Sequence, residues 1–375
     1  MPALRPDVDP DGLLEYSVVF TDRSLNHMSA RFQGVMRALS ARLKQVYGAE
    51  GVALVPGGGS FAMEAVARQF ATGKKALVLR NGWFSYRWSQ IFEAAGIPAS
   101  SVVMRAERVG DGPQAPFAPP GLEAVVARIA EERPDVVFAP HVETSAGVIL
   151  PDAYLAAVAE AAHAVGAVFV LDCVASGCVW VDMAALGVDV LVSAPQKGWS
   201  STPCAGVVML SALGRERAKA AKSTSFALDL GRWLQIMETY EGGGHGYHAT
   251  MPTDGLAAFE AATRETEAMG FEAAKAAQWA LGARVRALLA ARGYASVAAE
   301  GFAAPGVVVS YTEEPTIKSG ARFAAAGLQI AAGVPLEVGE GAGFSTFRIG
   351  LFGLDKLKDV DGCVARLEAA LAQMG

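Results

Sequence analysis

The 375-residue chain has few cysteines and few histidines, which limits the disulfides and metal sites it could form. Its four cysteines, Cys173, Cys178, Cys204 and Cys363, stand among apolar or small residues. Neither they nor the five histidines show the paired spacing of a zinc site or of a secreted disulfide framework. We therefore expect reduced thiols, a reducing compartment and no bound metal.

Long apolar runs and runs of one charge are also missing. No uninterrupted apolar stretch reaches the roughly 18 residues that a membrane-spanning helix needs. Residues 1–20 alternate prolines and acids, and they lack the basic-then-apolar layout of a secretory signal. The net charge of -6 is spread along the chain, without a Lys/Arg-rich run of the kind that binds nucleic acid. These absences predict a cytoplasmic protein that binds neither membranes nor nucleic acid.

The composition provides ample apolar material for a large core, because 52% of the residues are hydrophobic and 19% are charged. Single cores stop growing at about 250 to 300 residues, so we expect two unequal domains. We place a large domain at residues 20–260 and a small domain at residues 1–19 together with 261–375.

Short apolar runs alternate with amphipathic helical patterns over most of the chain. Strands are expected within residues 51–60, 75–84, 99–107, 135–145, 167–174, 189–197 and 206–210, and helices at 28–47, 61–70, 122–132 and 153–165. After residue 212 the pattern changes to long Ala-rich helices, notably over 256–291, and then to strand-like segments at 306–312, 327–336 and 345–353. The chain is predicted to be an α/β protein with a mainly parallel sheet between helices and a smaller α+β C-terminal domain.

Residues that could take part in catalysis or ligand binding follow several of the expected strands. In such sheets the carboxyl ends of the strands converge on one cleft. That cleft is expected to contain a glycine-rich helix entry, an aromatic ring, a hydroxyl, a carboxylate and an amine, supplied by Gly58, Gly59, Ser60, Phe84, Thr144, Asp172, Gln196 and Lys197.

Lys197 and Asp172 carry the most specific signal in this set. A lysine amine that is partly desolvated and near other cations has a lowered pKa and can form a Schiff base. Asp172 follows the apolar run "VFVL", so its carboxylate needs a positive partner such as a protonated pyridine nitrogen. Backbone N–H groups at Gly59 and Ser60 favour a phosphate. An amine, an acid, a phosphate cradle and a stacking face together predict pyridoxal 5'-phosphate as cofactor.

Other interpretations of the same residues stay open. The segment "GGGSFA" at 57–62 also fits a dinucleotide fingerprint, and Arg80 could accept a 2'-phosphate, as in an NADP-dependent oxidoreductase. A non-catalytic sensor or scaffold is a further alternative. Structural alternatives exist for single residues too: Lys197 as a solvated loop cation, Asp172 as a helix cap, Phe84 as a core aromatic, Thr144 as a turn hydroxyl, and Tyr247 as part of an exposed loop.

The chain resembles the class V aminotransferases of the pyridoxal-phosphate fold-type I superfamily, in particular the alanine/serine-glyoxylate and 2-aminoethylphosphonate-pyruvate aminotransferases. The motifs "GGGSFAMEA", "NGWFSYR", "HVETSAGV", "LDCVAS", "SAPQKG", "YHATMP" and "FRIGLFG" occur in the order typical of that family, between about residues 51 and 353. The resemblance thus covers most of the chain.

The resemblance implies a role for each matching residue. Lys197 is expected to form the internal aldimine and to move the proton between the substrate Cα and the cofactor C4', and Asp172 to pair with the pyridine nitrogen. Val174 packs under the ring, Phe84 stacks on it, and Thr144 bonds its phenolic oxygen. Gly58, Gly59, Ser60 and Gln196 hold the phosphate, Tyr247 and Thr250 reach it from the neighbouring subunit of a homodimer, and Arg348 binds the substrate carboxylate through a bidentate fork.

The expected reaction is a ping-pong transfer of an amino group from alanine or serine to a small 2-oxo acid such as glyoxylate or pyruvate. An alternative donor is 2-aminoethylphosphonate, because Ser60 stands where glyoxylate-specific members often have histidine. Binding of that donor would require further cationic side chains near Arg348, and Arg23 and Arg87 are candidates. A lyase or desulfurase is less favoured, since neither Cys204 nor Cys363 lies in an obvious mobile loop. The segment 9–24 replaces the "GPGP"-like opening of the family and puts the substrate in doubt.

Overall fold

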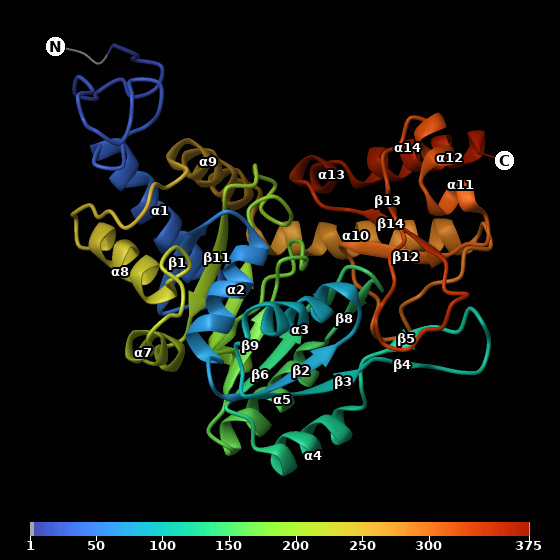
Figure 1. The fold of residues 1–375 in the computed structure, drawn as a ribbon. Coiled ribbons are helices and arrows are strands. Elements are labelled where there is room, and N and C mark those ends of the chain that lie inside the picture. The colour runs from blue at the N-terminus through green and yellow to red at the C-terminus, as the bar shows by residue number, and fades with distance from the viewer. Residues whose placement is uncertain (1–3, 375) are drawn as a thin grey trace.

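A seven-stranded sheet forms the centre of the computed structural model, which describes residues 4–374 (Figure 1). The strand order is β1-β11-β10-β9-β6-β2-β3. Strand β11 pairs antiparallel with β1 and β10, whereas β10, β9, β6, β2 and β3 pair in parallel. The bounds are β1 (Gly51–Pro56), β2 (Lys75–Arg80), β3 (Ser100–Arg105), β6 (Val136–Pro140), β9 (Val168–Asp172), β10 (Val190–Ser193) and β11 (Ala205–Leu210). The predicted mainly parallel sheet is confirmed.

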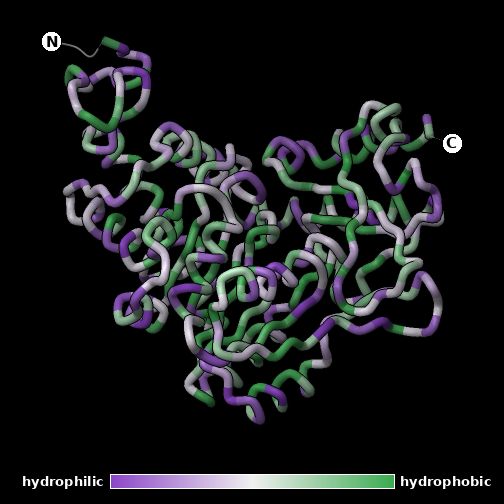
Figure 2. The backbone as a smooth tube through the Cα atoms, in the orientation of Figure 1, coloured by the Kyte–Doolittle hydropathy of each residue, from purple (hydrophilic) through white to green (hydrophobic). Residues whose placement is uncertain are grey.

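Helices cover both faces of this sheet and explain why its strands read as continuous apolar runs. Every residue of β6, β9, β10 and β11 is buried, as expected for strands without a solvent-facing side. Figure 2 shows the corresponding hydrophobic colouring of the interior segments. The helices are α1 (Ala30–Tyr47), α2 (Gly59–Phe70), α3 (Trp83–Ala95), α4 (Leu122–Glu132), α5 (Asp152–Ala164), α6 (Met183–Leu186), α7 (Ala212–Ala220) and α8 (Leu230–Glu241).

The segment predicted as helical over 256–291 consists of two helices, α9 (Thr253–Met269) and α10 (Phe271–Ala290). They are separated at Gly270, whose φ of +90° is a conformation that side chains other than glycine rarely adopt. Helix α10 packs against a three-stranded antiparallel sheet in the order β12-β14-β13. Its strands are β12 (Val307–Tyr311), β13 (Ala331–Ala332) and β14 (Thr346–Gly350), so the strand expected within 327–336 shrinks to two residues.

Short elements complete the chain. Two small hairpins pair β4 (Glu107–Arg108) with β5 (Phe117–Ala118) and β7 (Val142–Glu143) with β8 (Val148–Ile149). The last helices are α11 (Pro315–Lys318), α12 (Ala321–Ala325), α13 (Leu354–Lys358) and α14 (Val360–Gln373). Within residues 4–374, no helix is long and apolar enough to cross a membrane.

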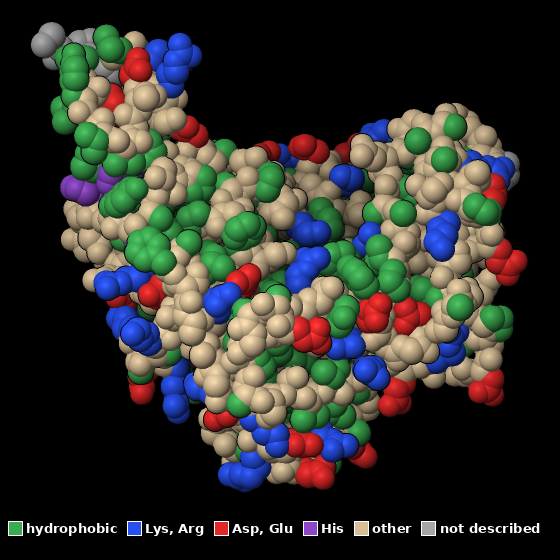
Figure 3. Space-filling model, viewed as in Figure 1, with side chains coloured by type: hydrophobic (Ala, Val, Ile, Leu, Met, Phe, Trp, Pro, Cys, Tyr) green, Lys and Arg blue, Asp and Glu red, His purple; other side chains and the backbone are tan. Residues whose placement is uncertain are grey.

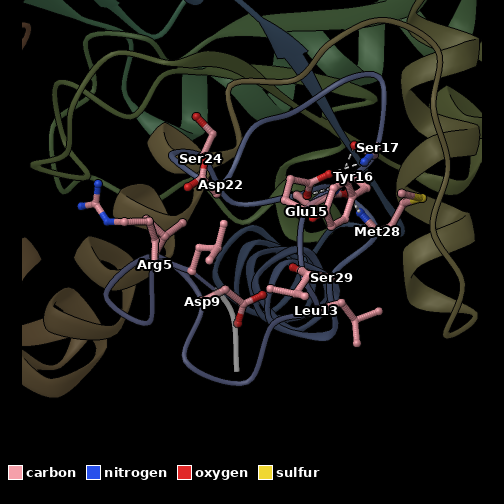
Figure 4. Close-up of a pocket in the computed structure, with 14 residues that line it drawn as sticks. Arg5, Asp9, Leu13, Glu15, Tyr16, Ser17, Asp22, Ser24, Met28 and Ser29 are labelled. Atoms are coloured by element: carbon pink, nitrogen blue, oxygen red, sulfur yellow. Dashed lines mark hydrogen bonds between the residues drawn. The ribbon is translucent and has the colours of Figure 1, made fainter. Parts of the chain in front are cut away.

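Residues 4–28 form an extended arm that precedes α1. In Figure 1 the arm lies on the opposite side of the molecule from the C-terminal elements α11 to α14. It encloses a hollow whose lining includes Arg5, Asp9, Tyr16 and Ser29 (Figure 4). Leu13 and Tyr16 of the arm are 90% and 88% exposed. The division of the chain into domains at residues 1–19, 20–260 and 261–375 stays a prediction.

Candidate active site

A cavity of about 130 Å³ lies where the carboxyl ends of the parallel strands meet. It is lined by Gly59, Ser60, Met63, Phe84, Arg87, Val142, Thr144, Asp172, Val174, Ala175, Gln196 and Lys197. These residues come from the N-terminal parts of α2 and α3, from β7 and the turn after it, from the end of β9 and the loop after it, and from the loop after β10. The surface is hollowed between the large sheet and the C-terminal elements, and Lys and Arg side chains gather at this hollow (Figure 3). The structure thus brings together eight of the predicted site residues.

The start of α2 forms one wall of the cavity. Gly58 precedes the helix in an extended conformation and offers no side-chain cap. At Gly59 a Cβ atom would lie 2.8 Å from Cγ2 of Val174, so a larger residue would collide there. The first N–H groups of a helix have no partner within the helix, and the helix dipole makes that end positive. This wall is therefore suited to an anion such as a phosphate.

Asp172 ends β9 and is almost fully buried. Its Oδ1 accepts a hydrogen bond of 2.9 Å from the backbone N–H of Val174. Burial raises the pKa of Asp172 to about 6, and the positive charges of Arg87 and Lys197 oppose this rise. Among hydrogen bonds within residues 4–374, the Val174 N–H is the single donor to this carboxylate. The second oxygen of this buried carboxylate, Oδ2, accepts no hydrogen bond from residues 4–374 and is therefore available to a protonated ring nitrogen.

Lys197 lies in the loop after β10 and lines the same cavity. Burial lowers the pKa of its ammonium, the negative charge of Asp172 raises it, and the charges of Arg348 and Arg87 lower it further. The net effect makes the neutral amine easier to form. A neutral amine is the nucleophile that attacks an aldehyde.

Glu143 holds the start of α3 and thereby the position of Phe84. Its fully buried carboxylate accepts hydrogen bonds from the backbone N–H groups of Phe84 at 3.2 Å and Ser85 at 2.9 Å. The hydroxyls of Ser85 and Ser145 each donate to it at 2.7 Å. Residue 82 must be glycine here, because a Cβ would lie 2.1 Å from Oγ of Ser145. The sequence contains the acid in "HVETS" but gives no sign that it caps a helix 58 residues away.

His141, the first residue of "HVETS", does not line the cavity. It is fully buried, and its Nδ1 lies 2.7 Å from Oγ of Ser176. Burial lowers the pKa of His141 to about 3, so the ring is neutral at physiological pH.

Two guanidinium groups flank the ring of Phe84. Cζ of Arg87 lies 5.3 Å from the ring centroid and Cζ of Arg348 lies 5.5 Å from it, within cation–π range. Strand β14 carries Arg348, whose Nε donates a 2.9 Å hydrogen bond to the carbonyl of Ala332 on β13. The small sheet therefore places Arg348 beside a residue that lines the cavity, although Arg348 itself does not line it.

Tyr247 and Thr250 lie outside the cavity of their own chain. The Tyr247 hydroxyl and Oγ1 of Thr250 are 3.1 Å apart, and the Tyr247 ring is 5.5 Å from that of His27. Tyr247 is 52% exposed. The candidate cation Arg23 is also exposed and does not line the cavity. Within residues 4–374, no three His, Cys, Asp or Glu side chains are grouped as metal ligands.

Comparisons with known proteins agree with this geometry. The sequence profile described as aminotransferase class-V matches residues 13–308. A 2-aminoethylphosphonate–pyruvate transaminase of Burkholderia thailandensis is 29% identical over 394 residues, which cover 100% of this chain and 99% of the relative. A protein of Synechococcus sp. named soluble hydrogenase, small subunit, is 29% identical over 360 residues, which cover 94% of this chain and 88% of the relative.

Among solved structures, an alanine–glyoxylate aminotransferase from Nostoc sp. superposes with a TM-score of 0.78 at 21% identity, over 93% of this chain and 89% of the other. The family match, the fold and a cavity lined by both a lysine amine and a buried carboxylate define a pyridoxal-phosphate-dependent transaminase of fold type I. Within that class, the chain belongs to the class-V aminotransferase family. The predicted cofactor, pyridoxal phosphate, is confirmed, and the NADP-dependent alternative finds no support in the family.

Proposed function

We propose that the protein transfers an amino group from a small amino acid, alanine or serine, to glyoxylate or pyruvate by a ping-pong mechanism, with Lys197 as the essential amine. The observation that carries this proposal is that Lys197 and Asp172 line one cavity, where burial lowers the pKa of the first and raises that of the second. Two titratable groups whose surroundings shift them in opposite directions are typical of acid–base pairs in active sites.

Bound pyridoxal phosphate supplies an aldehyde and an electron-withdrawing ring, which together make the Cα proton of an amino acid removable. Lys197, as a neutral amine, would take up that proton from the substrate Cα and would give it up again later in the transfer. Asp172, when ionised, keeps a proton on the ring nitrogen. Phe84 and Val174 hold the ring, and the hydroxyl of Thr144 orients the phenolic oxygen.

The phosphate end and the carboxylate end of the site use different groups. Gly58, Gly59, Ser60 and Gln196 bind the phosphate at the positive end of α2. Arg348 binds the substrate carboxylate, for which its planar fork of N–H donors is matched. Its distance of 5.5 Å from the Phe84 ring supports this placement at the entrance.

The direct test adds alanine, serine or 2-aminoethylphosphonate separately to the holoenzyme and follows the absorbance of the bound cofactor. Rapid loss of the visible absorbance of the lysine-bound cofactor is expected with alanine or serine. The Lys197→Ala variant should bind cofactor without turnover, and full turnover by that variant would contradict the proposal. Faster conversion with 2-aminoethylphosphonate would select the second candidate donor, which is supported by the Burkholderia relative and by the two guanidinium groups beside Phe84.

A homodimer with shared active sites is part of the proposal. Tyr247 and Thr250 are exposed and lie outside the cavity of their own chain, where they could reach the phosphate of a second copy. The arm exposes Leu13, Tyr16 and, more fully still, Val18, and a partner subunit would cover these apolar side chains. Sedimentation velocity should give a dimer for the wild type and a weakened dimer when the three arm residues are replaced by serine. A wild-type monomer that is fully active would contradict shared sites.

We also propose a cytoplasmic location. All four cysteines are free thiols, and three of them are buried. Free thiols suit a reducing compartment. Fractionation of the native cells with an antibody to this protein would test the assignment.

A further inference from the structure

The guanidinium of Arg87 lies beside the start of α2, which is the wall of the cavity suited to phosphate. Arg87 lies one turn after Phe84 on α3 and lines the cavity. Its Nη1 donates a hydrogen bond of 2.9 Å to Oγ of Ser60, in the first turn of α2. The sequence motif "NGWFSYR" contains this arginine, and the cofactor-binding set expected from the sequence does not.

The one carboxylate that lines the cavity with Arg87 is Asp172, and its negative charge also faces Lys197. The ion pairs formed within residues 4–374 do not include Arg87. Its neighbours are the positive N-terminal ends of α2 and of its own helix α3, where a cation is disfavoured. Lys197 shares the cavity and Arg348 approaches the same Phe84 ring. An oxyanion between Arg87 and the start of α2 would compensate this excess of positive charge.

The hydrogen bond to Ser60 also prepares that hydroxyl for an anion. Because Oγ of Ser60 accepts the N–H of Arg87, its own proton remains available for donation. A phosphate oxygen can then accept from the hydroxyl, while the guanidinium retains further N–H donors in a planar fork.

We propose that Arg87 is a further cofactor-binding residue, which binds the phosphate of pyridoxal phosphate directly and orients Ser60 toward it. The proposal rests on the cofactor site of the proposed function. A phosphonate group of a substrate offers the same chemistry, and we assign Arg87 to the cofactor because its hydrogen bond is made to the start of α2 rather than to the small sheet that carries Arg348.

The test compares pyridoxal phosphate with pyridoxal, which lacks the phosphate, in titrations of the apoenzyme. Arg87→Gln should raise the dissociation constant of pyridoxal phosphate by about tenfold or more, because a charge-assisted bidentate contact is lost. The dissociation constant of pyridoxal should change less than about twofold, since pyridoxal makes no phosphate contact. Arg348→Gln is the matched control, because it removes the other guanidinium beside Phe84 and should leave both constants unchanged.

A second set of variants keeps the test informative if Arg87→Gln is poorly folded. Arg87→Lys retains the charge and should show a smaller loss of affinity for pyridoxal phosphate. Ser60→Ala should also weaken only the phosphorylated ligand, and its effect should not add to that of Arg87→Gln, since the two side chains act as one unit. Inorganic phosphate should raise the melting temperature of the wild-type apoenzyme more than that of Arg87→Gln or Arg87→Lys.

Three results would overturn the proposal. Equal losses for both ligands would mean that Arg87 only supports the Phe84 ring. Unchanged affinity for pyridoxal phosphate would show that the phosphate lies elsewhere, and a slower reaction with 2-aminoethylphosphonate alone would assign Arg87 to the substrate. If the wild type itself fails to bind pyridoxal phosphate, the proposed function fails, and this outcome is distinct from the other three.

Discussion

Replacing Asp172 by asparagine is expected to stabilise the apoenzyme while weakening its hold on the cofactor. Asparagine keeps an oxygen that can accept the N–H of Val174, so the backbone contact of the wild type survives. What it removes is the buried negative charge. In the apoenzyme that charge destabilises the folded state, because burial disfavours an ionised carboxylate. When a protonated ring nitrogen lies beside it, the same charge stabilises the bound cofactor.

The magnitude follows from the shifted pKa. The carboxyl of Asp172 has a pKa of about 6 in the folded chain against an ordinary value of 3.8. This difference corresponds to about 3 kcal/mol of lost stability at pH 7.5, present in the wild type and absent in the variant. The sign is fixed by linkage: the folded state binds the proton more tightly, so the penalty is absent below about pH 4 and complete above about pH 7.

Thermal denaturation of the apoenzymes at several pH values measures this effect. Asp172→Asn should melt about 4 °C above the wild type at pH 7.5, and the difference should fall to roughly half at pH 5. Asp189→Asn is the control, since Asp189 is also buried beside the sheet but accepts hydrogen bonds from the N–H of Phe169 at 2.8 Å and from His163 at 2.9 Å. That variant should melt below the wild type at pH 7.5.

Affinity for pyridoxal phosphate completes the experiment. Asp172→Asn should bind the cofactor more weakly at pH 7.5, because the protonated nitrogen loses its partner. A variant whose apoenzyme is less stable than the wild type at pH 7.5, with a difference independent of pH, would refute the reasoning that the carboxylate is buried at an electrostatic cost.

Three other perturbations test separate parts of the site. Wild-type affinity for pyridoxal phosphate should decrease as the pH falls through about 6, where Asp172 takes up a proton, and a titration flat from pH 7.5 to 5 would count against the pairing. Glu143→Gln should lower the stability by about 2 to 4 kcal/mol in chemical denaturation, because an amide cannot accept from every donor around it, whereas exposed Glu123→Gln should not. Arg348→Lys should raise KM for the amino donor at least about tenfold with cofactor affinity unchanged, and an unaltered KM would remove Arg348 from substrate binding.

The general architecture was accessible from the sequence because parallel strands buried on both faces are continuous apolar runs. Asp172 ends one of those runs and Lys197 closely follows the end of the next, and together they identify the cleft, since the carboxyl ends of neighbouring parallel strands are adjacent. Local patterns also predict α4 at residues 122–132 with the bounds that the structure shows. The sequence pattern does not predict the helix break at Gly270, because the alanine-rich segments on both sides favour helix. A single glycine with positive φ does not change the hydrophobic periodicity around it.

The contacts that complete the site join residues far apart in the sequence. Glu143 caps a helix 58 residues before it, and Arg87 reaches a serine 27 residues before it. Arg348 arrives from the small sheet, whose strand β13 has only two residues and a weak pattern. Such contacts depend on how helices and sheets pack, and neither periodicity nor local spacing encodes them.

The most direct test of the account is chemical labelling of the lysine. The holoenzyme is treated with borohydride, digested and analysed by mass spectrometry. We predict that the mass of a reduced phosphopyridoxyl group appears on the peptide containing Lys197, with loss of the visible absorbance of the cofactor. A label on another lysine, or a cofactor that stays removable by dialysis after reduction, would contradict the central claim that the amine of Lys197 is the covalent attachment point.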